Sequence, residues 1–248
     1  MTLEARDVRL EGRLAGITAR LEPGTITAIC GPNGAGKSSL LQALAGLLPV
    51  AGDLLLDGEA LACLYPRERA QRIGYLPQQG EVAWDLSVRS LVSLGRLPHG
   101  GGADAVERTL AALDLAGLAH RPVSTLSGGE RARVLLARVL AGEPRWILAD
   151  EPLAALDLAH QLAILTILRD AATAGAGVVL VLHDLPLAMN YADRVIVLDR
   201  GEVATDGPPS EALSASVLAR VWTVDAEWIG QPGRRALLLR PGGHDNVR

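Results

Sequence analysis

Aromatic side chains are scarce in this sequence. It holds 248 residues without a single phenylalanine, and aromatic residues make up only 3% of it. Leucine, valine, isoleucine and alanine must therefore fill the core. Hydrophobic and charged shares of 49% and 21% are typical of a folded globular protein. The length allows one large α/β domain, or one domain that carries an inserted subdomain.

Long apolar runs and a surplus of basic charge are also missing. No uncharged apolar stretch reaches the ~18 residues that indicate a membrane span, and the longest one, residues 38–52, contains Gln42 and Pro49. Charged residues occupy the start of the chain, where a secretion signal needs an apolar stretch. We therefore expect a cytoplasmic protein unless a partner holds it at a membrane. A formal net charge of −4 argues against nucleic acid as a partner.

Cysteine is rare as well, with Cys30 and Cys63 as the only two. Their spacing fits neither a metal site nor a disulfide framework, so both are interpreted as reduced thiols. Cys30 ends the apolar run 26–30 and is predicted to lie in the core.

What the sequence does contain is an alternation of strand-like and helix-like segments. Short apolar runs predict strands at residues 25–30, 53–56, 146–149, 178–182 and 194–198. Leucines at three- and four-residue spacing predict amphipathic helices over residues 37–48 (Leu40, Leu41, Leu44, Leu48) and 158–168 (Leu158, Leu162, Leu165, Leu168). Strands that are apolar throughout fit a sheet covered on both faces. These patterns predict an α/β fold with a mainly parallel central sheet.

The middle of the chain has a different pattern. Residues 87–140 show helical spacing and turns without a convincing strand, and residues 100–102 are three glycines that predict a loop. We therefore expect a helical subdomain at about 87–140, inserted into a core sheet subdomain made of residues 1–86 and 141–248. After Pro208 the sequence predicts one short helix over residues 210–222.

A glycine-rich segment follows the first predicted core strand and opens a helix. Residues 31–38 match the P-loop pattern G-x-x-x-x-G-K-[ST]. Its glycine amides would converge on phosphates, Lys37 would reach the β- and γ-phosphates of ATP, and the Ser38 hydroxyl would ligate Mg²⁺. A glycine-rich turn before an ordinary helix is the structural alternative, which the flanking strand disfavours. The candidate nucleotide-binding residues are Gly31, Pro32, Asn33, Gly34, Ala35, Gly36, Lys37, Ser38 and Ser39.

Two acids end the strand predicted at residues 146–149. Asp150 would lie at the sheet edge near the metal, and Glu151 could orient or deprotonate the attacking water. An acidic turn that caps the strand is the better interpretation of this segment taken alone. Beside a P-loop, a catalytic pair is favoured.

Residues 126–130, Leu-Ser-Gly-Gly-Glu, form a second phosphate-binding device at the start of a predicted helix. This segment resembles the signature sequence of ABC ATPases, in which the signature of one subunit closes over ATP held by the P-loop of another. The resemblance implies a single ABC ATPase domain over 1–248 with N-terminal antiparallel strands. It also implies a head-to-tail homodimer in which Ser127, Gly128 and Gly129 contact nucleotide.

Three further residues occupy positions that the family uses. Gln78 looks like the glutamine that senses Mg²⁺ and the attacking water, and Asp157, within residues 155–157, belongs to a loop similar to the one that crosses the dimer interface. His183 looks like the histidine that contacts the γ-phosphate, although a histidine that ends a strand is more often structural. The resemblance implies Gln78, Lys37, Glu151 and His183 as catalytic residues, and Ser38, Gln78 and Asp150 as metal ligands.

Residues 87–99 are similar to the helical stretch of ATPases that serve iron-siderophore, haem and cobalamin importers. Such a stretch would shape the groove that receives a helix of the membrane permease; a generic amphipathic helix is the alternative. The resemblance implies a polytopic permease dimer and a substrate-binding protein as partners. It places the protein peripherally at the cytoplasmic face of the inner membrane.

One departure from the family concerns the adenine base. Many members stack an aromatic residue of the N-terminal strands on adenine, but the first aromatic in this chain is Tyr65. Arg9 or Leu10 could replace it in part, since a guanidinium can lie flat on a ring. We therefore expect modest nucleotide affinity and similar use of ATP and GTP.

Three other functions remain open. An exporter motor would keep the same chemistry, and an ATPase of a soluble assembly would keep it without a permease. A P-loop switch protein would have no need of residues 126–130, which disfavours it.

Overall fold

The computed structural model describes residues 2–78, 85–154 and 156–240. Their strands are β1 (Leu3–Leu10), β2 (Leu14–Leu21), β3 (Ile26–Cys30), β4 (Ala51–Leu56), β5 (Glu59–Ala60), β6 (Ile73–Leu76), β7 (Trp146–Asp150), β8 (Gly177–Val181), β9 (Arg194–Asp199), β10 (Glu202–Gly207), β11 (Ala226–Ile229) and β12 (Ala236–Leu239). Their α-helices are α1 (Lys37–Leu44), α2 (Pro66–Arg72), α3 (Val88–Ser93), α4 (Ala103–Ala112), α5 (Gly128–Ala141), α6 (Leu158–Thr173), α7 (Leu185–Tyr191), α8 (Pro209–Ala212) and α9 (Ala215–Trp222). Short 3₁₀ turns are η1 (Leu61–Cys63), η2 (Leu94–His99), η3 (Ala116–Leu118) and η4 (Val123–Thr125).

A six-stranded sheet forms the centre of the molecule, in the order β10-β9-β3-β8-β7-β6. The pairs β9–β3, β3–β8, β8–β7 and β7–β6 are parallel, and β10 is antiparallel to β9. A second sheet, β2-β1-β4-β5, is antiparallel and includes the N-terminal strands. The predicted α/β fold with a mainly parallel sheet and N-terminal antiparallel strands is confirmed.

Both faces of the central sheet are buried. Along β8, Val179 and Val181 pack into a cluster with α1 and the antiparallel sheet, whereas Val178 and Leu180 face a second cluster with the remaining helices. This alternation explains why the core strands are apolar throughout. Cys30 is fully buried at the end of β3, as predicted, and burial raises the pKa of its thiol to about 12. Cys63 is exposed.

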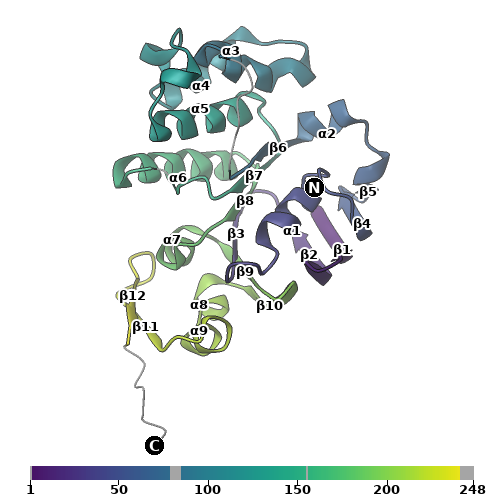
Figure 1. The fold of residues 1–248 in the computed structure, drawn as a ribbon, viewed down its shortest axis with the longest axis vertical. Helices are drawn as coiled ribbons and strands as arrows, with labels where there is room; N and C mark the ends of the chain where they lie inside the picture. The colour runs from purple at the N-terminus through teal and green to yellow at the C-terminus, as the bar shows by residue number, and fades with distance from the viewer. Residues whose placement is uncertain (1, 79–84, 155, 241–248) are drawn as a thin grey trace, which may run out of the picture.

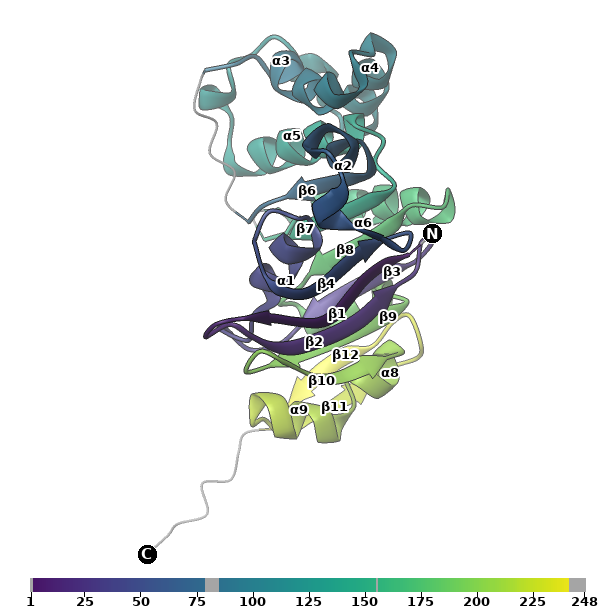
Figure 2. The same ribbon diagram turned by 90° about the vertical axis from the view of Figure 1, so that its right-hand side faces the viewer.

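Helices gather at one end of the central sheet. Figures 1 and 2 show α3, α4 and α5 together above the sheet, and α8, α9 and the β11–β12 hairpin at the opposite end. Between residues 87 and 141, all of which are described, the secondary structure is helical apart from one isolated bridge between Ser87 and Pro122. Gly95 lets η2 contact α5 closely, because a Cβ there would lie 1.9 Å from the Arg138 carbonyl oxygen.

Helix α1 is shorter than predicted. It ends at Leu44 instead of Leu48, and Gly46 follows in the left-handed region with φ of +66°. A glycine in this conformation is a common way to end a helix. The prediction that Leu48 belongs to the helical core face was therefore wrong.

Helix α6 is longer than predicted, and part of its leucine pattern was misassigned. Its buried face consists of Ile164, Leu165, Leu168 and Ala172. Leu158 and Leu162 were expected on that face, but they are 78% and 49% exposed. At 3.6 residues per turn these two leucines lie toward the edge of the buried arc, so the three- and four-residue spacing alone placed the face incorrectly.

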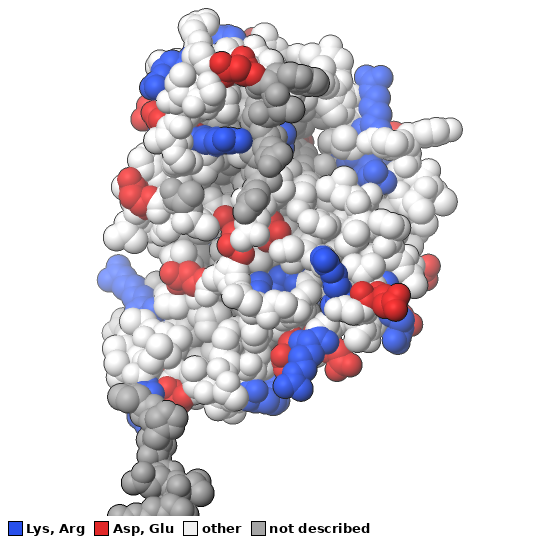
Figure 3. Space-filling view, in the orientation of Figure 1, with Lys and Arg blue, Asp and Glu red and all other residues white. Residues whose placement is uncertain are grey.

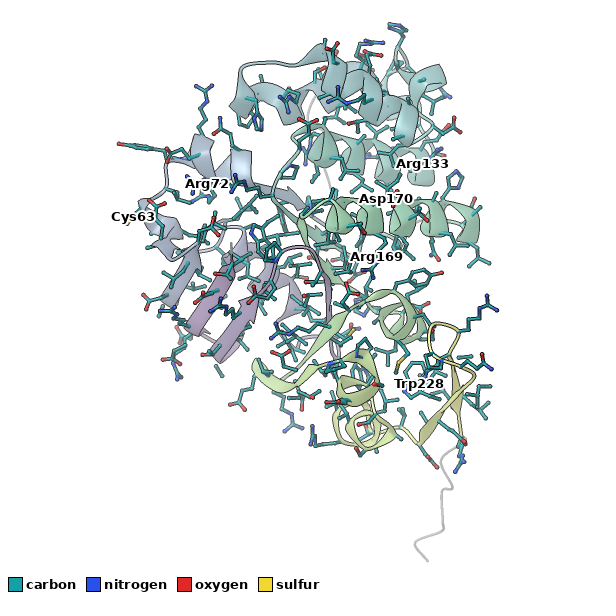
Figure 4. The ribbon with its side chains drawn as sticks, turned by 180° about the vertical axis from the view of Figure 1, so that it is seen from behind. Cys63, Arg72, Arg133, Arg169, Asp170 and Trp228 are labelled. Atoms are coloured by element: carbon teal, nitrogen blue, oxygen red, sulfur yellow. The ribbon has the colours of Figure 1, made fainter. Side chains whose placement is uncertain are left out.

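The C-terminal region also differs from the prediction. The single helix expected over residues 210–222 is two helices, α8 and α9, because the chain leaves the helix at Leu213 and Ser214 begins the next one. The β11–β12 hairpin was not predicted. Trp228 of β11, labelled in Figure 4, holds the hairpin on the helices by donating from Nε1 to the Leu213 carbonyl at 2.6 Å.

The surface carries mixed charge. On the face in Figure 3, acidic and basic side chains are interspersed and neither forms a continuous stripe. Within the part of the chain that the structure describes, no helix combines the length and hydropathy needed to cross a membrane.

Candidate nucleotide site

The turn between β3 and α1 is possible only because of its glycines. Gly31, Gly34 and Gly36 have φ of +148°, +81° and +97°, values that side chains with a Cβ rarely adopt. A Cβ on Gly31 would lie 2.2 Å from the Leu198 carbonyl oxygen, and one on Gly36 would lie 2.6 Å from the Arg13 carbonyl oxygen. The loop is thus folded tightly between neighbouring strands, with the N-terminus of α1 directed into the space beyond it.

An open cavity of about 830 Å³ lies over this turn. Its lining residues are Gly12, Arg13, Asn33, Gly34, Gly36, Lys37, Ser38, Ser39, Gln78, Glu151 and His183. It therefore brings together residues from five separate parts of the chain, and the sequence had singled out nine of these residues. Four other residues predicted for this site do not line the cavity: Gly31, Pro32 and Ala35, which form the base of the turn beneath it, and Asp150 at the end of β7.

Lys37 is a buried cation at the floor of the cavity. Its side chain is only 6% exposed, and Nζ donates to the carbonyl oxygens of Gly31 and Pro32, each at 2.9 Å. Burial lowers the pKa of Lys37, while the Glu151 carboxylate, followed by Cys30 and Asp150, acts in the opposite direction. The ammonium group is positioned by backbone oxygens for an anionic ligand.

Asp150 is a buried carboxylate at the end of β7. It is 3% exposed, and its Oδ1 has no hydrogen-bond partner among the described residues. Burial raises its pKa, and a hydrogen bond with the Ser38 hydroxyl acts in the opposite direction. A buried oxygen without a donor beside a serine hydroxyl fits a hard cation such as Mg²⁺, which takes oxygen ligands. The described residues contain no cluster of three or more histidines, cysteines and acids, so such an ion would need oxygens from the nucleotide or water.

Glu151 and His183 form a pair at the edge of the cavity. Glu151 Oε1 lies 2.5 Å from His183 Nε2, and the two side chains are 15% and 44% exposed. Glu151 has φ of +52°, an uncommon conformation for a residue with a side chain. Strained backbone conformations of this kind are often found at functional sites. Gln78 reaches the same cavity from the end of β6.

A second cavity of about 550 Å³ lies at the start of α5 and is lined by Ser127, Gly129, Glu130, Arg133, Leu156, Asp157 and His160. Ser127 is the N-cap: its Oγ accepts from the Glu130 amide at 3.3 Å, and its own amide donates to Glu130 Oε2 at 2.8 Å. The backbone hydrogen bond from Ser127 is the main reason that the pKa of Glu130 is lowered. Gly128 does not line the cavity, although it begins α5.

Asp157 reaches this second cavity as the N-cap of α6. Its Oδ1 accepts from the His160 amide at 2.9 Å and lies 2.7 Å from His160 Nδ1. These contacts, the backbone hydrogen bond first, lower the pKa of Asp157. Residue 155, which the sequence placed in the same loop, lies outside the described residues.

The two cavities share no lining residue. Each combines backbone amides at a helix N-terminus with hydroxyl groups, an arrangement that binds phosphate. One chain thus presents two separate candidate sites for phosphate.

Sequence reasoning missed several residues of both cavities. Arg13 and Gly12 line the first, although Arg9 and Leu10 were the residues expected near the base. Arg9 instead pairs with Asp7 at 2.7 Å, and Leu10 packs against the core. In the second cavity, Arg133 and His160 were not predicted, since neither belongs to a motif that implies chemistry.

The fold and the first cavity define a P-loop nucleotide-binding protein. The ABC transporter family matches residues 14–154. A haemin import ATP-binding protein, HmuV, of Nocardia farcinica is 45% identical over 97% of this chain and 89% of its own, and one of Myxococcus xanthus is 45% identical over 98% of both. The chain belongs to the ABC transporter family, as one of its ATPase subunits.

Solved structures agree with this assignment. A metal-chelate type ABC transporter in an inward-facing conformation matches with a TM-score of 0.80 at 26% identity, over 97% of both chains. The cassette MJ0796, in a dimeric post-hydrolysis state bound to ADP and Pi, matches with a TM-score of 0.76 at 27% identity. That match covers 84% of this chain and 98% of the cassette.

Proposed function

We propose that this protein binds MgATP in the first cavity and hydrolyses it to drive import through a membrane permease. The P-loop amides and Lys37 bind the β- and γ-phosphates. Ser38, Asp150 and Gln78 would hold Mg²⁺, whose charge would offset that of the phosphates. The unpartnered oxygen of Asp150 is the main support for a metal there.

The dimer is the central part of the proposal. Two phosphate-binding cavities without a common lining residue are the observation that carries it. In a head-to-tail homodimer, the P-loop of one copy meets Ser127–Gly129 and Asp157 of the other, so each ATP is enclosed by two chains. ATP binding then closes the pair, and hydrolysis lets it open.

Hydrolysis depends on position and charge more than on covalent chemistry. Glu151 accepts a proton from the attacking water or orients it. His183, whose Nε2 lies 2.5 Å from Glu151 Oε1, contacts the γ-phosphate and fixes the carboxylate. Gln78, which lines the same cavity, responds to the presence of the γ-phosphate.

The cargo class follows from the relatives. Those matched at 42% to 45% identity carry the name haemin import ATP-binding protein. We infer import of haem or of a related iron chelate, with a polytopic permease dimer at the cytoplasmic face of the inner membrane. A substrate-binding protein acts on the other side, and no nucleic acid is involved.

The permease surface lies where α2 meets η2. Arg67 Nε and Gln71 Nε2 both donate to the Pro98 carbonyl oxygen at 2.7 Å, which joins the two elements. Beside this junction Tyr65 and Leu97 are 76% and 68% exposed. We infer that a permease helix covers them, and that residues 87–140 move relative to the core subdomain of residues 1–86 and 141–248.

Two alternatives keep the same ATPase chemistry. An exporter motor is possible on the fold alone, since an Atm1-family exporter with ATP bound matches with a TM-score of 0.79 at 26% identity. An ATPase of a soluble assembly would lack a permease. The names of the more similar relatives favour the importer.

The test is to tag the Glu151→Gln variant, extract it from host membranes in mild detergent with MgATP, and identify what copurifies. The importer account predicts a polytopic membrane protein. The complex with active Glu151, reconstituted in vesicles, should then accumulate haem in preference to cobalamin. A soluble partner alone, or ATP-driven efflux, would contradict the importer and favour one of the alternatives.

A further inference from the structure

Arg13 occupies a fixed position in the turn between β1 and β2. Its amide donates to the Leu10 carbonyl at 2.9 Å, and the amide of Ala15 in β2 donates to the Gly201 carbonyl at 2.9 Å. Its own carbonyl oxygen lies so close to Gly36 and Gly201 that a Cβ at either would approach it within 2.7 Å. The backbone of Arg13 is therefore wedged between the P-loop and the turn after β9.

Strand order places Arg13 on one particular side of the P-loop. The P-loop follows β3, and β3 lies between β9 and β8 in the sheet. His183 follows β8, and Glu151 follows β7, on the far side of β8. Arg13 contacts Gly201, which follows β9 on the opposite side. A nucleotide whose γ-phosphate meets Glu151 and His183 therefore extends its nucleoside end toward Arg13.

The Arg13 side chain is available to a ligand. It is exposed, lines the first cavity, and its Nη1 lies 3.4 Å from Ser39 Oγ. Within the described part of the chain it has no carboxylate partner, whereas Arg9 on the same hairpin is paired with Asp7. No aromatic residue is among the described residues that line this cavity.

We propose that the Arg13 guanidinium stacks on the nucleobase and takes the place of the missing aromatic residue; this rests on the proposed ATPase function. A guanidinium is planar, weakly hydrated and attracted to aromatic faces. Stacking uses the face of the base and not its hydrogen-bonding edge, so it binds adenine and guanine alike. Arg13 therefore increases the affinity for the nucleoside without discriminating between adenine and guanine.

The experiment measures equilibrium binding of ATP, GTP and inorganic tripolyphosphate, each with Mg²⁺, to the full chain. Arg13→Ala should weaken ATP and GTP about three- to tenfold and to the same extent, and leave tripolyphosphate unchanged. Arg13→Tyr, which restores a flat ring, should recover the affinity, whereas Arg13→Lys, which restores only the charge, should not. Arg9→Ala is the matched control and should bind like the parent chain.

Other outcomes would overturn the proposal. Recovery by Arg13→Lys together with weaker tripolyphosphate binding would assign Arg13 to the phosphates. Two results would contradict base stacking by Arg13 and leave the proposed ATPase function intact. One is that the parent chain binds ATP much more tightly than GTP, and the other is that Arg13→Ala and Arg9→Ala bind nucleotide equally well. A parent chain that binds no nucleotide would contradict the proposed function itself.

Discussion

The two phosphate-binding cavities of this chain are built in different ways. The P-loop is held by its backbone: Gly31 and Gly36 have positive φ and touch neighbouring carbonyl groups that leave no room for a Cβ. The signature segment is held by a helix cap, in which Ser127 and Glu130 exchange hydrogen bonds, and a Cβ on Gly128 would meet nothing within 4 Å. One device is folded into the core, and the other is presented outward.

This difference separates two tasks. The P-loop cavity is lined by the buried cation Lys37 and by the Glu151–His183 pair, and the buried Asp150 hydrogen-bonds to its lining residue Ser38, so these groups are suited to bind nucleotide and cleave it. The signature cavity has amides, a hydroxyl and mixed charges, but it lacks a comparable buried cation among its described lining residues. It is suited to complete a phosphate site that another chain provides.

The largest expected effect is a loss of ATP cleavage that leaves ATP-driven dimerisation intact. Glu151→Gln should lower ATP turnover by a hundredfold or more, on the order expected for loss of a general base, because the amide cannot accept the proton. The variant should still form dimers when ATP is added, since the phosphate contacts remain. Steady-state phosphate release and sedimentation velocity measure the two effects, with the exposed Glu202→Gln as control. Normal turnover in the variant would remove Glu151 from its role.

A change in the signature cavity should act on the dimer alone. Ser127→Arg should lower turnover by about ten- to a hundredfold, because its bulk displaces the phosphate that the partner's P-loop presents. ATP binding to the separate chain, measured by calorimetry, should stay within about twofold of the parent, because Ser127 does not line the first cavity. A twofold change in Kd corresponds to about 0.4 kcal/mol. Ser124→Arg makes the same change at an exposed serine outside the cavity. If Ser127→Arg abolished ATP binding itself, the two cavities would not be independent.

Glycine substitutions in the P-loop and in the signature segment should change the free energy of unfolding by different amounts. Gly36→Ala should lower the free energy of unfolding by about 1–3 kcal/mol, because the residue has φ of +97° and its Cβ would meet the Arg13 carbonyl. Gly128→Ala should stay within about 0.5 kcal/mol of the parent, since its surroundings are open and alanine favours helices. Urea unfolding measures both. Equal losses would mean that the signature is as constrained as the P-loop.

The smallest effect concerns Asp150 and depends on pH. Burial raises the pKa of the Asp150 carboxyl, so the fold loses stability as pH rises from the usual aspartate range through that raised pKa. Asp150→Asn should therefore raise the melting temperature by about 2–4 °C at neutral pH. The gain should shrink as pH is lowered toward the range where Asp150 is protonated. A lower melting temperature at neutral pH would show that the carboxylate is structural.

The core of the fold could be predicted because its signals are local. Apolar runs predicted β3, β7, β8 and β9 of the parallel sheet, since burial on both faces requires apolar residues at every position. The edge strand β6 was missed, because its two middle residues are only half-buried and it forms no apolar run. The end of α1 and the exposed Leu158 and Leu162 could not be predicted in this way. They depend on where Gly46 turns and on how α6 is rotated against the sheet, which the spacing of leucines leaves open.

The residues of the candidate site also fall into two groups, those that local motifs predicted and those that they missed. Lys37, Asp150 and Glu151 belong to motifs whose spacing carries their chemistry, and the structure brings them together. Arg13 reaches its cavity only through a tertiary contact, a hairpin wedged against the P-loop, whereas His160 reaches the second cavity through the local cap that Asp157 forms at the start of α6. No spacing along the chain indicates the contact of Arg13 with the P-loop, which is why Arg9 or Leu10 was expected near the base.

The central claim is that each working site needs the P-loop of one chain and the signature of another. The most direct test mixes two variants in the Glu151→Gln background, one carrying Lys37→Ala and the other Ser127→Arg, and measures mass by sedimentation with MgATP. Each variant alone should remain monomeric, because neither can form a complete site. The mixture should yield mixed dimers, because one intact P-loop then faces one intact signature. Dimers of either variant alone, or a mixture that stays monomeric while the Glu151→Gln parent dimerises, would contradict the account.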